Sequence, residues 1–145
     1  MTFDNFLFVY GTLMSSETGP LGGKERARLQ REGKSLGPAT IAGRLYDLGE
    51  CPGLVDARSA ADLVHGEVFA LATPAATLAW LDAYEDVAPG AAKPGEYERI
   101  QRAVRLARGT DVSVWAYLYR GDLSAARQIP GGRWRGVKTR VSAKK

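Results

Sequence analysis

One carboxylate, Glu85, falls on the side of a predicted helix that should be buried. On a helical wheel of about 100° per residue, with Leu78 at 0°, Leu81 falls at ~300° and Glu85 at ~340°. Glu85 therefore lies inside the apolar stripe, where burial raises the pKa of a carboxyl group and makes it a better base near neutral pH. This position predicts a general acid/base. The alternative is a structural ion pair with an arginine of a neighbouring strand, Arg99 or Arg102.

The second candidate is a tetrapeptide at a strand end, Tyr10-Gly11-Thr12-Leu13. It ends the continuous apolar run 6–10, which predicts a buried strand. A small residue followed by a hydroxyl at such a point allows successive main-chain N–H groups to converge on an anion. The tetrapeptide thus predicts an anion-binding turn, and the alternative is an ordinary strand end.

Few other residues could carry chemistry. The single Cys51 excludes an internal disulfide framework, and with the single His65 it argues against a Cys/His zinc site. Residues 19–25 superficially suggest a phosphate loop, but Glu25 stands where a Ser or Thr would bind magnesium. We therefore expect chemistry performed mostly by carboxylates, hydroxyls and main-chain groups.

The elements that would position these residues are mostly strands. Arg108 to Asp111 predicts a hairpin turn, and Pro52-Gly53 suits a type II turn. Because strands dominate and helices are scattered, the predicted fold class is α+β, with a largely antiparallel sheet curled toward a barrel. Strands are expected over residues 6–10, 39–48, 63–71, 97–106 and 112–119, and helices over 24–32 and 73–86.

Positive charge is concentrated at the C-terminal end. The net charge is +4, and seven of the 20 basic residues but none of the 16 acidic ones follow Asp122. We expect a solvated basic tail, and the alternative is a nucleic-acid contact in which Trp134 stacks between Arg133 and Arg135. No apolar run approaches the ~20 residues that span a bilayer, and the first residues lack a secretory signal pattern. These features predict a cytoplasmic protein.

The motifs follow one another in an order that resembles the γ-glutamylcyclotransferase-like family, which includes the AIG2-like proteins and the γ-glutamylamine cyclotransferases. Each motif is short, but their number and order make the resemblance specific, and it spans residues 6–134. The motifs are Tyr10-Gly11-Thr12-Leu13, residues 43–49, 52–55 and 64–69, residues 81–85 with 97–99, and residues 115–117 and 129–134.

The resemblance implies a small mixed β-barrel with a few flanking helices, formed by residues 1–136 and followed by a basic tail at 137–145. It implies an enzyme that converts a γ-glutamyl amide into 5-oxoproline and a free amine without metal or cofactor. By position, Glu85 matches the family's general acid/base. Tyr10, Gly11, Thr12 and Leu13 match the loop that holds the glutamyl group, and Tyr117 resembles a ring that lines the pocket.

The sequence also departs from the family pattern. Asp86 follows Glu85 where glycine is frequent, and Cys51 stands where an aromatic residue is common, which leaves the substrate open. One alternative is a non-catalytic small-molecule-binding protein on the same fold. Another is a related acyltransferase or cyclase that acts on a different γ-glutamyl-type intermediate. The expected partner is a small γ-glutamyl molecule. We expect no membrane partner, and a nucleic-acid contact only as the alternative role of the basic tail.

Overall fold

The computed structural model describes residues 5–11, 13–15, 17, 23–49, 51–84 and 97–134. Within these ranges, no helix has the length and apolar character needed to cross a membrane. The predicted tail at 137–145 lies outside the described residues.

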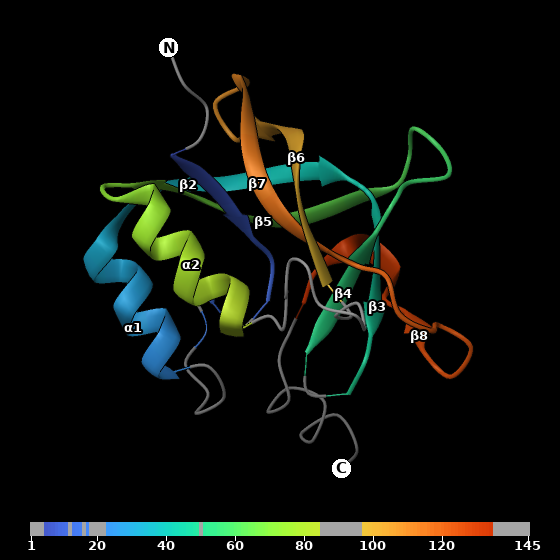
Figure 1. Ribbon diagram of the computed structural model, residues 1–145. Coiled ribbons are helices and arrows are strands. Elements are labelled where there is room, and N and C mark those ends of the chain that lie inside the picture. The colour runs from blue at the N-terminus through green and yellow to red at the C-terminus, as the bar shows by residue number, and fades with distance from the viewer. Residues whose placement is uncertain are drawn as a thin grey trace.

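Five strands close into a barrel in the order β1-β5-β2-β6-β7 (Figure 1). Neighbouring strands pair antiparallel except β1 and β7, which run parallel and meet at Leu7 and Trp115. The mixed, largely antiparallel barrel predicted from the sequence is therefore confirmed. The strands are β1 (Phe6–Val9), β2 (Gly33–Ala42), β5 (Leu63–Leu71), β6 (Tyr97–Leu106) and β7 (Asp111–Tyr119).

A second sheet of three strands lies beside the barrel, in the order β4-β3-β8. Its strands are β3 (Arg44–Asp47), β4 (Pro52–Val55) and β8 (Arg127–Gln128). The single strand predicted over 39–48 is wrong, because the chain leaves the barrel at Gly43 and begins β3. A Cβ atom at Gly43 would lie 2.6 Å from the Leu54 side chain and 2.9 Å from the Val55 oxygen, so glycine lets the chain pass close to β4.

The turn predicted at Pro52-Gly53 is also wrong, since these residues open β4. The turn lies just before them, where the Leu48 N–H donates to the Cys51 oxygen at 3.0 Å and Gly49 has a φ of +111°. Gly53 instead serves packing, because a Cβ atom there would lie 2.9 Å from the Cβ of Tyr119. The hairpin predicted at residues 108–111 is confirmed, with Leu106 N–H donating to the Thr110 oxygen at 2.8 Å.

Two helices pack outside the barrel, α1 (Gly23–Glu32) and α2 (Pro74–Tyr84), and a short 3₁₀ turn, η1 (Pro130–Gly132), follows β8. Figure 1 shows α1 and α2 on the same side of the barrel. Glu32, at the end of α1, joins them by accepting hydrogen bonds from Thr77 Oγ1 at 2.5 Å and Trp80 Nε1 at 2.9 Å.

The barrel wall separates two hydrophobic cores. Alternate strand residues face opposite sides, so β5 directs Val64 and Val68 into the barrel but Phe69 and Leu71 toward the helices. The inner core includes Phe8, Tyr10, Ala39, Ile41, Val64, Val68, Val104, Leu106, Val114, Ala116 and Leu118. The outer core, between barrel and helices, includes Leu7, Val9, Leu13, Leu29, Phe69, Leu71, Leu78, Leu81 and Tyr117.

Candidate active site

The last described turn of α2 is fixed to the barrel through Asp82. Arg99 of β6 donates from Nε to Asp82 Oδ1 at 2.7 Å and from Nη2 to Oδ2 at 3.0 Å. The hydroxyl of Tyr117 on β7 donates to the same Oδ1 at 2.6 Å, and the Arg99 guanidinium lies 4.5 Å from the centre of the Trp115 ring. The hydrogen-bonded Asp82 carboxylate raises the pKa of Arg99. Strands β6 and β7 therefore fix the position of the end of α2.

Glu85, the predicted general acid/base, lies outside the described residues, which follow α2 as far as Tyr84. The helix register used to place it is confirmed at Leu78 and Leu81, which are both buried in the outer core. The two arginines considered as alternative partners for Glu85 are each bonded to another carboxylate. Arg99 pairs with Asp82, and Arg102 pairs with Asp56 at 3.1 Å.

Tyr10 projects into the barrel rather than away from it. Its side chain is buried in the inner core, where its hydroxyl donates to the Tyr117 main-chain oxygen at 2.6 Å and accepts from Leu54 N–H at 3.3 Å. These bonds fix the point at which the chain leaves β1. A direct contact between Tyr10 and a substrate stays a prediction.

Gly11 begins a turn that packs tightly against β4. A Cβ atom at Gly11 would lie 2.9 Å from Pro52 Cγ, so only glycine fits without a shift. Pro52 is held in turn by the hydroxyl of Tyr97, which donates to the Pro52 oxygen at 2.8 Å. Met14 N–H donates to the Gly11 oxygen at 3.1 Å and closes the turn. Thr12, the residue expected to supply a hydroxyl, lies outside the described residues.

Leu13 packs the turn after β1 against the core that lies between the barrel and α2. Its side chain is 5% exposed and belongs to the same outer core as Leu81 of α2 and Tyr117 of β7. Figure 1 shows α2 lying along β1, with both elements ending toward the same side of the molecule. Of the residues predicted for the site, Leu13 and Tyr117 thus lie in one core with Leu81 of α2. Tyr10 bonds to the Tyr117 main chain from inside the barrel, and Gly11 lies against Pro52 of β4.

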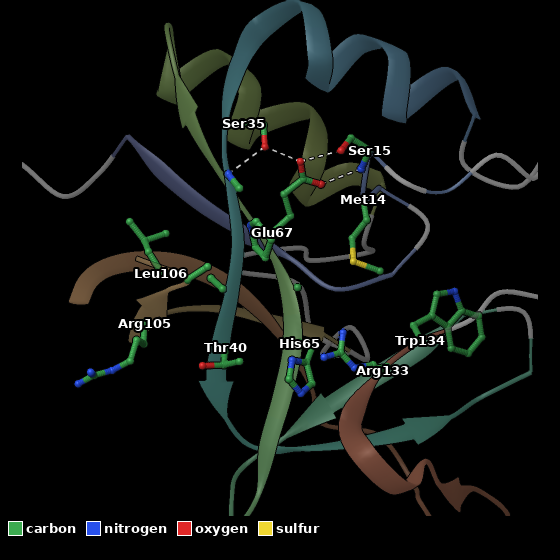
Figure 2. Close-up of a pocket in the computed structure, with 15 residues that line it drawn as sticks. Met14, Ser15, Ser35, Thr40, His65, Glu67, Arg105, Leu106, Arg133 and Trp134 are labelled. Atoms are coloured by element: carbon green, nitrogen blue, oxygen red, sulfur yellow. Dashed lines mark hydrogen bonds between the residues drawn. The ribbon is translucent and has the colours of Figure 1, made fainter. Parts of the chain in front are cut away.

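The sequence did not single out Glu67 on β5 as a site residue. Glu67 is 8% exposed, and its carboxylate accepts three hydrogen bonds, which are drawn in Figure 2. Ser15 donates from its main-chain nitrogen at 2.7 Å and from Oγ at 2.8 Å, and Ser35 Oγ donates at 2.5 Å. The available signal was an acid in the middle of an otherwise apolar strand, where a charge needs hydrogen-bonding partners.

A cavity of about 840 Å³ adjoins Glu67 (Figure 2). Met14 and Ser15 line it on the side of the turn, and His65, Arg133 and Trp134 line it farther along. Burial and the nearby Arg133 guanidinium lower the pKa of His65, which favours a neutral imidazole near pH 7. Over the described ranges, no three His, Cys, Asp or Glu side chains are grouped so as to bind a metal ion.

These features define a small α+β barrel protein whose candidate site lies where a helix end meets the turn after the first strand. The family model described as "Gamma-glutamyl cyclotransferase, AIG2-like" matches residues 7–136. The chain belongs to this family, which supports a γ-glutamylcyclotransferase-like role in general.

Solved structures share the fold. The ytfP protein of Escherichia coli is 30% identical, with a TM-score of 0.61 over 89% of this chain and 95% of that one. An AIG2-like protein of Mus musculus is 21% identical, with a TM-score of 0.61 over 91% and 95%. YkqA of Bacillus subtilis is 20% identical with a TM-score of 0.67, and the match covers 97% of this chain but 43% of YkqA. No curated protein matches the sequence.

Proposed function

We propose that the protein releases 5-oxoproline and a free amine from a γ-glutamyl amide. The observation that carries the proposal is the packing of Leu13 against the core that also holds Leu81 and Tyr117, because it brings the turn after β1 to the helix that leads into Glu85. Family membership supports cyclotransferase chemistry in general. The choice of a γ-glutamyl amine as substrate is part of the proposal.

The reaction uses a nucleophile that the substrate itself carries. The α-amine attacks the γ-carbonyl carbon, a five-membered ring forms, and the bond from that carbon to the departing amine nitrogen breaks. The α-ammonium group loses two protons on becoming the lactam N–H. Glu85 accepts the first and passes it to the departing nitrogen as the C–N bond breaks, and the second leaves with the product amine, which departs as an ammonium ion. No water is consumed, because the attacking nitrogen belongs to the substrate. Holding the substrate in a ring-like conformation supplies much of the rate, since well-oriented intramolecular reactions gain about 7–11 kcal/mol.

The turn after β1 supplies the anion-binding part of the proposal. Met14 and Ser15 use their N–H groups within the protein, bonding to the Gly11 oxygen and to Glu67. A ligand would therefore be bound by the N–H groups from Gly11 to Leu13, which would hold the substrate's α-carboxylate or the developing oxyanion. The ring of Tyr117 would line the pocket, while its hydroxyl stays bonded to Asp82.

The test is a panel of γ-glutamyl amines, γ-glutamyl dipeptides and γ-glutamyl-lysine, assayed for release of 5-oxoproline and free amine. Turnover of at least one compound supports the proposal. Binding of these compounds without turnover would identify a non-catalytic binding protein instead. Conversion to a product other than 5-oxoproline would identify a different γ-glutamyl cyclase or acyltransferase.

A further inference from the structure

Glu67 stands at the point where β1 ends and the turn begins. In the sheet register it lies opposite Val9, the last residue of β1, and opposite Pro38 of β2. Figure 2 shows its carboxylate between Ser35 on one side and Ser15 on the other. A β-bulge between Ser35 and Gly37 shifts the register of β2 beside it. Bulges change the direction in which a side chain points, and here Ser35 reaches Glu67.

The two bonds from Ser15 fix the far end of the turn. One comes from the main-chain N–H and the other from Oγ, so the carboxylate restrains both the backbone and the side chain of a single residue. The near end is fixed by Tyr10, whose hydroxyl bonds inside the barrel. Gly11, Leu13 and Met14 therefore lie between two residues that are held in place, Tyr10 and Ser15. Hydrogen bonds to a charged group are stronger than those between neutral groups.

We infer that Glu67 is a positioning residue, which orients the main-chain N–H groups of Gly11 and Leu13 for the glutamyl carboxylate by holding Ser15. The inference rests on the proposed function, because it assigns this turn to substrate binding. Glu67 touches no substrate in this scheme. Its loss would release one end of the turn and lower the fraction of molecules in which the N–H groups converge.

The experiment compares Glu67→Gln and Glu67→Met with the wild-type chain, using the γ-glutamyl amine that the wild type turns over. The carboxamide of Gln keeps one acceptor oxygen, whereas Met keeps the length of the side chain and removes both. The α-carboxylate of the substrate carries the same charge in the ground state and in the transition state. Weaker binding of this group should therefore raise KM and leave kcat nearly unchanged. We expect KM to rise about 10-fold or more in Glu67→Met and less in Glu67→Gln, with kcat within about threefold.

The chain offers a matched control. Asp122 also accepts both the N–H and the Oγ of one serine, Ser124, each at 2.9 Å, in an exposed loop. Asp122→Asn removes the charge from the same kind of contact outside the candidate site, and we expect it to leave both KM and kcat at wild-type values. If Glu67→Met does not fold, Glu67→Gln decides the question alone, with a KM increase of about threefold or more expected.

The outcomes separate the two proposals. A wild-type KM in every folded Glu67 variant, or a fall in kcat at unchanged KM, overturns the positioning role and leaves the proposed function in place. An equal KM increase in Asp122→Asn also overturns it, because the effect would then be general. If the wild type turns over no compound of the panel, the proposed function fails and the positioning role fails with it.

Discussion

Tyr10 donates its hydroxyl to the main-chain oxygen of Tyr117 at 2.6 Å, across 107 residues of sequence. The side chain of Tyr117 points to the other side of the barrel wall, where its hydroxyl bonds to Asp82. One residue of β7 thus contacts both the strand end that precedes the turn and the helix that leads into Glu85. The two halves of the candidate site are positioned by the same strand.

Tyr10→Phe is expected to lower the free energy of unfolding by about 1–3 kcal/mol. The change removes a buried donor to the Tyr117 oxygen and a buried acceptor for Leu54 N–H, and neither group can reach water in the core. Denaturant unfolding monitored by tryptophan fluorescence measures the difference. Tyr46→Phe is a suitable comparison, because that hydroxyl accepts from Arg44 in a less buried setting. Equal stabilities for the two variants would contradict the prediction.

Tyr117→Phe is expected to keep kcat/KM within about threefold of wild type, while Tyr117→Ala loses 10-fold or more. The proposal assigns the ring to the pocket, and Asp82 retains its two bonds from Arg99 when the hydroxyl is removed. Steady-state kinetics with the preferred γ-glutamyl amine give the comparison. A Phe variant as impaired as the Ala variant would show that the hydroxyl, not the ring, is what the reaction needs.

Glu85→Gln is expected to reduce kcat by about 10²–10⁴-fold, since it removes the group proposed to move protons. KM and the melting temperature should stay close to wild type, because glutamine has the same shape. Glu98→Gln provides a control, since Glu98 forms an exposed ion pair with Arg120. Wild-type turnover by the Glu85 variant would exclude this residue from the mechanism.

The contact between the helices should make stability depend on pH in the acid range. Hydrogen bonds from Thr77, Trp80 and Arg28 lower the pKa of Glu32 to about 2 from an ordinary value of 4.5. Because the pKa of Glu32 is lower in the folded protein than in the unfolded chain, the ionised Glu32 carboxylate stabilises the folded state above pH 4.5. This contribution is lost as the pH falls toward 2. Melting temperatures of wild type and Glu32→Gln should therefore converge between about pH 5 and pH 2. Parallel curves over that range would be inconsistent with a linked titration.

Removal of residues 137–145 is expected to leave kcat and KM within about twofold of wild type. The family model ends at residue 136, and we propose that residues 1–136 form the domain. Binding of short DNA and RNA should be measured in parallel at low and at physiological salt. Strongly salt-dependent binding that disappears with the tail would instead assign these residues to a nucleic-acid contact.

Sequence patterns predicted four of the five barrel strands and both helices. Apolar runs and alternation indicated the strands, apolar residues at helical spacing indicated α2, and a charged segment bounded by glycines indicated α1. Leu78 and Leu81 are buried as the wheel requires, and the hairpin at 108–111 follows from its turn residues. The strand predicted through Gly43 and the turn predicted at Gly53 were wrong for a physical reason. At both positions the absence of a side chain permits close packing, against Leu54 and Tyr119, and sequence alone does not show that a glycine in a strand or a turn pattern is needed for packing.

The part of the site that the sequence missed depends on contacts between distant segments. Glu67, Ser15 and Ser35 come from a strand, a turn and a bulged strand, and no local pattern links them. The pairing of Asp82 with Arg99 was likewise not predicted, although Arg99 was considered as a partner for Glu85. Which carboxylate an arginine of β6 meets depends on how the barrel packs against α2, and the sequence of either element alone does not show it.

The parallel pairing of β1 with β7 affects the order in which the parts of the protein fold. The first strand cannot find its partner at Trp115 until most of the chain has been synthesised. Contacts between residues that are far apart in the sequence form slowly, because a long loop must close, at a cost in chain entropy, before the contact stabilises the fold. The candidate site, which draws on both strands, should therefore be among the last regions to assemble, and nascent chains that end before β7 should lack it.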